Sequence, residues 1–314
     1  MPERRAAAGG GPSTGGRRTR RGRAVAVTSA ALLLAGGLAL AAACGIGSGG
    51  TTGERPQDSA RPSPSPTRPW DRHPESVAAV GDSISRGFDA CSLLADCDRV
   101  SWVTGTDPSV RSLAARLIDK SPARHSWNFA VSGSVMADLP AQMERAARKR
   151  PELVTVLAGA NDACRPTVEQ MTPVGEFRSD FRAALRTLHE SRPKAQMYVS
   201  SLPDLKRLWS QGRDDAWGER IWDLGICQSM LRDARSMKPA AQERRQQVHE
   251  RVMAYNSVLK DECGRFLRCR YDGGAVFRYR FTKTELSRWD WFHPSRAGQR
   301  KLAELAYRGI TARR

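Results

Sequence analysis

Short apolar runs alternate with longer amphipathic stretches from residue 76 to the C-terminus. The runs have the length of buried strands and are rich in β-branched, aromatic or other apolar side chains. They predict five strands, at Val77–Val80, Ser126–Ala130, Leu153–Ala158, Met197–Ser201 and Phe266–Tyr271. Strands that alternate with helical stretches are typical of a parallel sheet with helices on both faces. The pattern therefore predicts an α/β fold with three layers, α/β/α, around a five-stranded parallel sheet.

The amphipathic stretches have the spacing of helices that bury one face. The first is predicted to begin at Asp107-Pro108 and to bury an apolar face made of Val110, Leu113, Ala114, Leu117 and Ile118. Two more are predicted from the groups Phe177, Phe181, Leu185, Leu188 and Val248, Val252, Tyr255, Leu259. The last follows Pro294 and presents Leu302, Leu305 and Ala306.

The stretch from Lys206 to Pro239 interrupts this alternation. It is longer than an ordinary connection between a strand and a helix, and it holds Trp209, Trp217, Trp222 and Cys227. Two interpretations remain open. The stretch is either a lid or wall beside a binding site, or a structural excursion held by Cys227.

Four polar motifs lie where the predicted strands end or where the last helix begins. Gly81-Asp82-Ser83-Ile84-Ser85 follows the first strand, the segment 128–133 (Asn-Phe-Ala-Val-Ser-Gly) closes the second, and Gly159-Ala160-Asn161-Asp162 follows the third. Asp290-Trp291-Phe292-His293-Pro294 precedes the final helix. Ligands of open α/β sheets bind at the carboxyl ends of the strands. The four motifs are therefore expected to converge on one site.

In order and spacing, these motifs resemble those of the SGNH/GDSL hydrolase family, over the whole stretch from Val77 to the C-terminus. The resemblance implies a flavodoxin-like fold, with Ser83 as nucleophile, His293 as general base and Asp290 as the group that orients His293. It also implies an oxyanion hole made of the backbone N–H groups of Ser83 and Gly133 and the side-chain amide of Asn161. No metal and no cofactor are implied.

The chemistry of ester hydrolysis requires the same residue types independently. A hydroxyl must lose its proton, its base must be held in one tautomer, and fixed donors must meet the developing oxyanion. Two other serine hydrolase patterns do not fit. In chymotrypsin-like proteases Gly-Gly follows Gly-Asp-Ser, and here Ile84-Ser85 follows; the G-x-S-x-G elbow is absent because Ser85 stands at its second glycine.

The closest resemblance within the family is to bacterial lipases and phospholipase B-like members. It is carried by Gly81-Asp82-Ser83 before a cysteine-containing loop, by Ser101-Trp102 and by Cys164. The leading hypothesis is a serine ester hydrolase acting on lipids or acylated glycans. A carbohydrate O-deacetylase and a catalytically inactive envelope binding module are the alternatives. Trp289, Trp291 and Phe292 either line an acyl pocket or simply pack beside the catalytic loop.

The cysteines favour an oxidising compartment. The chain has seven, and six of them can form three disulfides if Cys44 carries a lipid. Two pairs are close in the sequence and leave a third, so the predicted bonds are Cys91–Cys97, Cys164–Cys227 and Cys263–Cys269. Reduced thiols are the alternative. Zinc is disfavoured because the chain contains no C-x2-C pair.

The N-terminus has the order of an export signal. A basic cluster at residues 17–23 is followed by the uncharged apolar run Ala24–Ala43. The run ends in Ala41-Ala42-Ala43-Cys44, which resembles a lipoprotein cleavage site except that Ala41 stands where the pattern has Leu. A lipid-anchored Cys44 is favoured, and an uncleaved membrane helix is the alternative.

These features divide the chain into three parts. Residues 1–44 are a signal peptide or membrane anchor, residues 45–75 a disordered linker rich in Gly, Ser and Pro, and residues 76–314 the hydrolase domain. The net charge is +18, and residues 1–75 hold 11 Arg and 5 acidic residues, which leaves +12 for the domain. Since no nucleic-acid motif is present, the charge suggests either attraction to anionic envelope surfaces or a solvated exterior. We expect an exported monomer tethered to the membrane.

Overall fold

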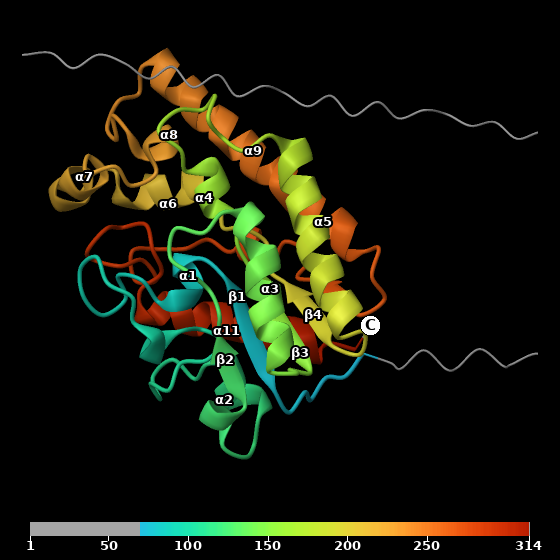
Figure 1. Ribbon diagram of the computed structural model, residues 1–314. Helices are drawn as coiled ribbons and strands as arrows, with labels where there is room; N and C mark the ends of the chain where they lie inside the picture. The colour runs from blue at the N-terminus through green and yellow to red at the C-terminus, as the bar shows by residue number, and fades with distance from the viewer. Residues whose placement is uncertain (1–69, 314) are drawn as a thin grey trace, which may run out of the picture. The chain divides into compact units, whose positions relative to one another are not determined.

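The computed structural model describes residues 70–313 and places a five-stranded parallel sheet at their centre (Figure 1). The strands are β1 (Val77–Gly81), β2 (Ser126–Asn128), β3 (Leu153–Leu157), β4 (Gln196–Val199) and β5 (Cys269–Tyr271). Their order is β2-β1-β3-β4-β5, and all four pairings are parallel. This is the flavodoxin-like order. The predicted fold class is confirmed.

The three central strands are buried along their whole length. Every residue of β1, β3 and β4 is inaccessible to solvent or nearly so. Strands that are covered on both faces consist of continuous apolar runs instead of an alternation of apolar and polar residues. This explains why the sequence shows these strands as short uninterrupted apolar segments. The polar motifs around Ser83 and Asn161 follow the carboxyl ends of β1 and β3.

Two layers of helices cover the sheet (Figure 1). On one face α3 (Leu139–Arg148), α5 (Val174–Ser191) and α9 (Pro239–Cys263) pack side by side. On the other face α2 (Leu113–Leu117) packs against α11 (Arg296–Thr311). The apolar faces predicted for the three longest helices are those that are buried, apart from Leu305, which is partly exposed.

The first predicted helix is much shorter than its sequence pattern suggested. Helix α2 begins at Leu113, so the predicted start at Asp107 was wrong. The Asp107 carboxylate accepts a hydrogen bond from the N–H of Ser109 at 2.9 Å, which forms a turn in place of a helix N-terminus. Arg111 has a φ of +48° and Ser112 caps the helix. Local hydrogen bonding of Asp and Ser therefore competes successfully with helix formation.

The stretch between β4 and α9 forms three helices: α6 (Leu205–Gly212), α7 (Ala216–Trp222) and α8 (Gln228–Leu231). Helices α6 and α8 pack against α9 and against each other. The remaining short elements are α1 (Ser83–Arg86), α4 (Ala160–Ala163), α10 (Ala275–Arg278) and the 3-10 turns η1 (Asp98–Val100), η2 (Pro122–Arg124) and η3 (Met136–Asp138).

Three disulfides connect these elements, and they join the same cysteines as the pairs expected from the sequence. They are Cys91–Cys97, Cys164–Cys227 and Cys263–Cys269. Disulfides of this kind are typical of exported proteins. The second one joins the end of α4 to the start of α8, and so attaches the α6–α8 segment to the carboxyl edge of β3.

The described chain begins slightly before the expected domain. The indole N–H of Trp70 donates to the carbonyl of Ile310 at 2.9 Å, and the N–H of Asp71 donates to Gln196 at 2.5 Å. Residues 70–75 thus contact the domain although the sequence assigns them to the linker. The expected signal segment, Cys44 and the rest of the linker lie outside the described residues. Within residues 70–313, no helix combines the length and hydropathy needed to cross a bilayer.

Candidate active site

Ser83 stands at the start of α1, directly after the central strand β1. The preceding residue, Asp82, is extended and caps the helix, because its carboxylate accepts a hydrogen bond from the N–H of Ile84 at 3.0 Å. The N–H groups of the first helical turn have no partner within the helix. Ser83 therefore offers both a hydroxyl and a backbone donor at the carboxyl end of the sheet.

The turn that carries Ser83 is fixed from several directions. The carbonyl of Ser85 accepts hydrogen bonds from the Ser101 hydroxyl at 2.7 Å and from the Asn128 amide at 2.8 Å. The carbonyl of Ile84 accepts one from the Gln299 amide at 2.8 Å. Donors from β2, from α11 and from the loop before α2 thus satisfy the carbonyls of α1. Each carbonyl of α1 has a hydrogen-bond partner, and these bonds hold the turn that carries Ser83 in place.

His293 and Asp290 lie on the loop that precedes α11, and both meet Ser83. The Nε2 atom of His293 lies 2.9 Å from the Ser83 hydroxyl oxygen, and Nδ1 lies 2.5 Å from Oδ2 of Asp290. The other carboxylate oxygen of Asp290 accepts the backbone N–H groups of Phe292 and His293, each at 3.0 Å. The ring of Phe88 lies against the imidazole at a centroid distance of 4.9 Å. The three predicted residues form one continuous hydrogen-bonded chain.

Burial and charge act in opposite directions on this pair. Burial of the His293 ring disfavours its charged form, but the neighbouring Asp290 carboxylate outweighs this effect and raises the pKa of His293. Burial likewise opposes ionisation of Asp290, yet the contact with His293 and two backbone N–H groups keeps its pKa below the usual value. Asp290 is fully buried. The pair therefore consists of an ionised carboxylate and a ring whose basicity is increased.

Gly133 lies on the loop after β2, and Asn161 lies on α4. Both residues and Ser83 line one cavity. Gly133 has a φ of +84°, a conformation that side-chain-bearing residues rarely adopt, whereas a Cβ there would meet no atom within 4 Å. The glycine is thus required by its backbone conformation. One amide hydrogen of Asn161 is donated to the carbonyl of Ser134 at 2.9 Å, which leaves the second for a ligand.

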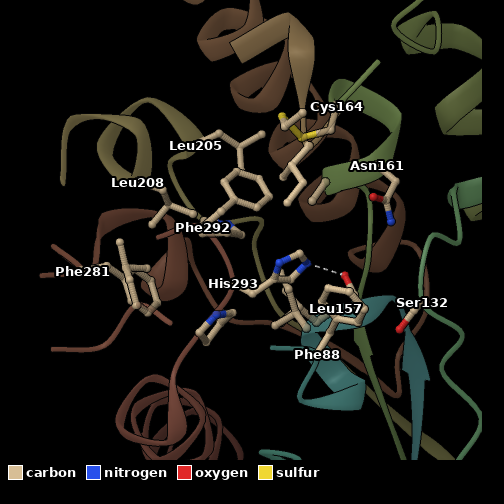
Figure 2. A pocket seen from close by; sticks show the side chains of 18 of the residues that line it. Phe88, Ser132, Leu157, Asn161, Cys164, Leu205, Leu208, Phe281, Phe292 and His293 are labelled. Carbon is tan, nitrogen blue, oxygen red and sulfur yellow. Dashed lines mark hydrogen bonds between the residues drawn. A yellow bond between two sulfur atoms is a disulfide. The ribbon is translucent and has the colours of Figure 1, made fainter. Parts of the chain in front are cut away.

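The cavity in front of Ser83 has a volume of about 260 Å³ and is predominantly apolar. Figure 2 shows Leu205, Leu208, Phe281 and Phe292 on one side of His293, and Asn161 with Ser132 on the other. Its polar groups are thus concentrated at one end. Further apolar side chains of the wall come from β3, α10, α11, the loop between α7 and α8 and the loop between α10 and α11: Leu157, Ile226, Val276, Leu286 and Leu302.

A comparison with protein families identifies the family of this chain. Residues 77–306 match the family model described as GDSL-like lipase/acylhydrolase, which covers well over half of the chain. The chain belongs to this family. Membership makes it a hydrolase of the lipase and acylhydrolase type. Among curated proteins, no match was found.

Several solved structures are similar to this chain over most of their length. LAE5, an alpha/beta hydrolase enzyme from the metagenome of Lake Arreo, is 19% identical, with 76% of this chain and 97% of that chain covered and a TM-score of 0.46. The corresponding values for phospholipase A1 from Streptomyces albidoflavus NA297 are 17%, 76%, 100% and 0.46. For the extracellular lipase from Streptomyces rimosus they are 17%, 74%, 99% and 0.44. These likenesses concern the fold alone.

The α6–α8 segment both forms a wall of the cavity and is held by Cys227, so both interpretations of this stretch of the sequence apply. Leu205, Leu208 and Ile226 form a wall of the cavity, and Cys227 fastens the segment through its disulfide. The indole N–H of Trp222 on α7 donates to the backbone carbonyl of Asp290 at 2.6 Å. The segment therefore supports the catalytic loop as well as the pocket.

The three aromatic residues of the catalytic loop have different surroundings. Phe292 lines the cavity, as one of the two interpretations proposed. Trp289 and Trp291 are not among the residues that line it. Trp291 packs against α7, where a Cβ at Gly218 would lie 2.5 Å from its ring. The indole N–H of Trp217 donates to the carbonyl of Trp289 at 3.1 Å. The side chain of Trp291 and the backbone carbonyl of Trp289 thus hold the loop against α7.

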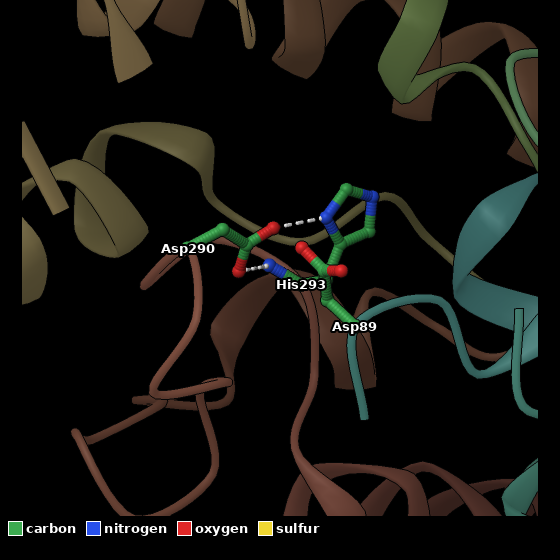
Figure 3. A group of neighbouring side chains, drawn as sticks. All are labelled: Asp89, Asp290 and His293. Atoms are coloured by element: carbon green, nitrogen blue, oxygen red, sulfur yellow. Dashed lines mark hydrogen bonds and ion pairs between the residues drawn. The ribbon is translucent and has the colours of Figure 1, made fainter. Parts of the chain in front are cut away.

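Asp89, a residue beside Asp290 and His293, was not singled out from the sequence. Asp89, on the loop after α1, has a ligand-type oxygen that lies within 4.8 Å of those of Asp290 and His293 (Figure 3). Within residues 70–313 this trio is the one group with the spacing of a metal site. A cation there would compete with the 2.5 Å hydrogen bond between Asp290 and His293. The close approach of Asp89, Asp290 and His293 is better explained by protons shared among these three side chains than by a metal ion.

Proposed function

We propose that this protein is an exported serine ester hydrolase that cleaves lipid acyl esters. Ser83 is the nucleophile, His293 the general base and acid, and Asp290 the carboxylate that orients the ring. The observation that carries the proposal is an apolar cavity that opens beside the Ser83–His293 pair. Family membership supports the reaction class, and the cavity supports the substrate class.

The first half of the reaction follows from the hydrogen-bonded chain. The Ser83 oxygen attacks the ester carbonyl carbon while Nε2 of His293, at 2.9 Å, takes the hydroxyl proton. Asp290 stabilises the imidazolium that forms and fixes the tautomer with Nδ1 protonated. The imidazolium then gives its proton to the leaving alcohol oxygen, and the ester C–O bond breaks. The acyl group remains on Ser83.

The negative charge of each tetrahedral intermediate falls on the former carbonyl oxygen. The backbone N–H groups of Ser83 and Gly133 and the free amide hydrogen of Asn161 are its donors, since these residues line the same end of the cavity. In the second half, His293 removes a proton from water, which attacks the acyl carbon. The proton returns to the Ser83 oxygen, and the acid leaves.

The cavity selects among ester substrates. An acetyl group would leave most of its apolar wall in contact with water, whereas an alkyl chain would bury that wall and gain about 0.8 kcal/mol for each methylene. The volume of about 260 Å³ is too large for an acetyl group alone. The cavity thus favours acyl chains longer than acetyl, and it argues against a deacetylase of the same fold.

A series of p-nitrophenyl esters tests this proposal. We expect kcat/KM to rise from acetate through butyrate to octanoate, because each added methylene buries more of the wall. Preference for acetate would instead support the carbohydrate O-deacetylase. Absence of both turnover and fluorophosphonate labelling of Ser83 would support the inactive binding module.

A variant of the pocket sharpens this test. Leu208 lines the cavity from α6, and Leu208→Trp would fill part of the space beside it. Because less room remains for a long acyl chain, kcat/KM for octanoate should fall by about tenfold or more, while acetate is hydrolysed as before. Leu267→Trp is the matched control, because Leu267 is 88% exposed and does not line the cavity. An equal loss for both esters would place Leu208 outside the acyl-binding site.

The proposal includes export and attachment to the membrane. Three disulfides support an oxidising compartment, and the sequence that ends at Cys44 supports a lipid anchor. In Cys44→Ser cells, we expect the hydrolase to move from the membrane fraction to the soluble fraction, or to keep its uncleaved signal. Unchanged membrane retention with unchanged mass would favour an uncleaved helix.

A further inference from the structure

Asp89 is a buried acid that takes no part in the reaction described above. It is 1% exposed and has a φ of +57°, a conformation that Asp and Asn adopt more readily than most residues. The N–H of Leu94 donates to its Oδ1 atom, and its own carbonyl accepts the Ser287 hydroxyl at 2.7 Å. The disulfide Cys91–Cys97 closes the loop that follows it. Its carboxyl group is thus held in one position.

The second oxygen of this carboxyl group is directed at the catalytic pair. Figure 3 shows the Asp89 carboxyl group beside Asp290 and the ring of His293. Within residues 70–313, Oδ2 of Asp89 has no hydrogen-bond partner if both acids are ionised, because carboxylates only accept. A proton on Asp89 removes this problem, since the acid can then donate to Asp290. Two buried carboxyl groups at this distance resist simultaneous ionisation.

The electrostatic surroundings favour a proton on Asp89 over one on Asp290. Burial, the charge of Asp290 and the hydrogen bond shared with it raise the pKa of Asp89 to about 7. Asp290, by contrast, is held ionised by His293 and by two backbone N–H groups. The charged groups that face Asp89 are Asp290 and His293. His293 additionally faces Asp82.

We propose that Asp89 is a positioning residue of the hydrolase site, which as a neutral acid donates a hydrogen bond to the Asp290 carboxylate. This inference rests on the proposed function of Ser83, Asp290 and His293. In the form of the protein that turns over, with a neutral His293 ring, this proton stays on Asp89. Its hydrogen bond fixes the carboxylate that orients the His293 ring, in addition to the bonds from Phe292 and His293.

The arrangement has a consequence for the charge of His293. When the trio of Asp89, Asp290 and His293 carries one net negative charge, its remaining mobile proton can lie on Asp89 or on the ring. In the first state the ring is neutral and accepts the Ser83 proton; in the second it is an imidazolium and cannot. When the Asp89 proton moves to the ring, the neutral base that Ser83 needs is lost. Removing its charge should extend activity to lower pH.

The test is the pH dependence of two reactions in Asp89→Asn. Asparagine keeps the tolerance of positive φ, the acceptor for Leu94 and a donor for Asp290, but it cannot ionise. We expect the acid limb of kcat/KM, and of the rate of fluorophosphonate labelling of Ser83, to move down by roughly one pH unit. The rate on the plateau should remain within about threefold of the wild-type rate, since the donor is retained.

Two further variants separate charge from hydrogen bonding. Asp98→Asn makes the same charge change nearby, but Asp98 pairs with Arg86 at 3.1 Å, so the acid limb should not move. Asp89→Ala removes charge and donor together. We expect its acid limb to move as in Asp89→Asn, while kcat on the plateau falls about tenfold with little change in KM. Melting temperatures identify preparations that have lost the fold.

The outcomes distinguish this inference from the proposed function. If the wild-type protein neither hydrolyses esters nor labels at Ser83, the proposed function fails, and with it the basis of the inference. If the wild-type protein is active but Asp89→Asn leaves the acid limb in place, Asp89 has no influence on His293 and the inference is overturned. It is overturned equally if folded Asp89→Ala keeps the plateau kcat of Asp89→Asn.

Discussion

Two regions of this protein bury acidic side chains. In one region the pKa of the buried acid is lowered, and in the other the pKa values of buried acids are raised. Between α5 and α9, the fully buried Glu262 accepts hydrogen bonds from Arg182 at 2.8 and 2.9 Å and from Arg178 at 2.7 Å. These arginines, Arg182 foremost, lower the pKa of Glu262 to about 2. A buried charge is tolerated here because arginine cations surround it.

Among the described residues, no arginine or lysine forms an ion pair with the buried acids beside His293. Asp82, Asp89 and Asp290 are each at most 1% exposed, and the group that opposes their charge is the ring of His293. Burial is the main cause that raises the pKa of Asp82, and likewise of Asp89, to about 7. Charge that is fully paired stabilises a fold, whereas charge that is left unbalanced adjusts proton affinities at a reactive site.

Ser83→Ala is expected to have the largest effect. Loss of the nucleophile should lower kcat by about 10⁶, as for other catalytic serines, because the remaining groups cannot form an acyl-enzyme. The melting temperature should stay within about 1–2 °C of the wild type, since the hydroxyl contributes little to packing. Ester hydrolysis by the purified domain and a thermal unfolding curve measure both quantities. Turnover near the wild-type rate would remove Ser83 from the reaction.

Asn161→Ala comes next. The free amide hydrogen of Asn161 meets charge that is fully developed only in the transition state, so its loss should lower kcat by about 10²–10³ with little change in KM. If Asn161 served only to hold the Ser134 carbonyl, the variant would lose stability but keep kcat once folded. Measuring kcat and the melting temperature on the same preparation decides between these roles.

The sequence was sufficient to predict those parts of the structure that depend on local patterns. The strands were visible because their burial produces apolar runs, and the motifs around Ser83, Asn161 and His293 each follow or precede a regular element. The start of α2 was not predictable in this way. It is determined by a turn at Asp107 and by a hydrogen bond from the N–H of Leu113 to the distant carbonyl of Trp102, at 2.7 Å.

Asp89 shows a second reason why part of the site escaped prediction. It belongs to no motif, and its neighbours in the sequence give no sign of chemistry. It acquires a role only because the fold brings the loop after α1 against the loop before α11, some 200 residues later in the chain. The contact of Trp222 with the Asp290 carbonyl is of the same kind. Such tertiary contacts leave no periodic signal.

Glu262→Gln tests the paired region. Its folded pKa of about 2 lies below the ordinary value of 4.5, so its charge stabilises the fold above about pH 4.5, and this contribution is lost as pH falls toward 2. At neutral pH the variant should lose about 3 kcal/mol of unfolding free energy, with kcat unchanged. Urea unfolding at pH 7 and pH 3 measures the difference, which should shrink at the lower pH.

Asp261→Asn is the matched control for this measurement. Asp261 is the neighbouring acid, and its side chain is 52% exposed and reaches Arg178 at a distance of 3.4 Å. An exposed pair of this kind contributes at most about 1 kcal/mol. If both variants lose the same stability, burial of Glu262 is not what makes its pairing matter. If Glu262→Gln changes kcat in the folded protein, the two regions are coupled and the contrast between them breaks down.

The smallest effects are expected where the α6–α8 segment holds the catalytic loop, at the two indoles of α7. Trp222 is 1% exposed and donates to the carbonyl of Asp290, whereas Trp217 is 46% exposed and donates to that of Trp289. Trp222→Phe leaves a buried carbonyl without its donor and should lower the unfolding free energy by about 1–2 kcal/mol. A slightly displaced Asp290 should also lower kcat about threefold with unchanged KM.

Trp217→Phe provides the comparison, because it removes the same donor from the same helix at an exposed position. Water can replace its hydrogen bond, so we expect a change within about 0.5 kcal/mol and an unaltered kcat. Urea unfolding and octanoate hydrolysis of both variants measure these quantities. If Trp222→Phe behaves like Trp217→Phe, α7 does not support the catalytic loop, and the segment contributes only the wall of the cavity. If kcat falls for Trp222→Phe alone, the segment also positions Asp290, through the hydrogen bond to its backbone carbonyl.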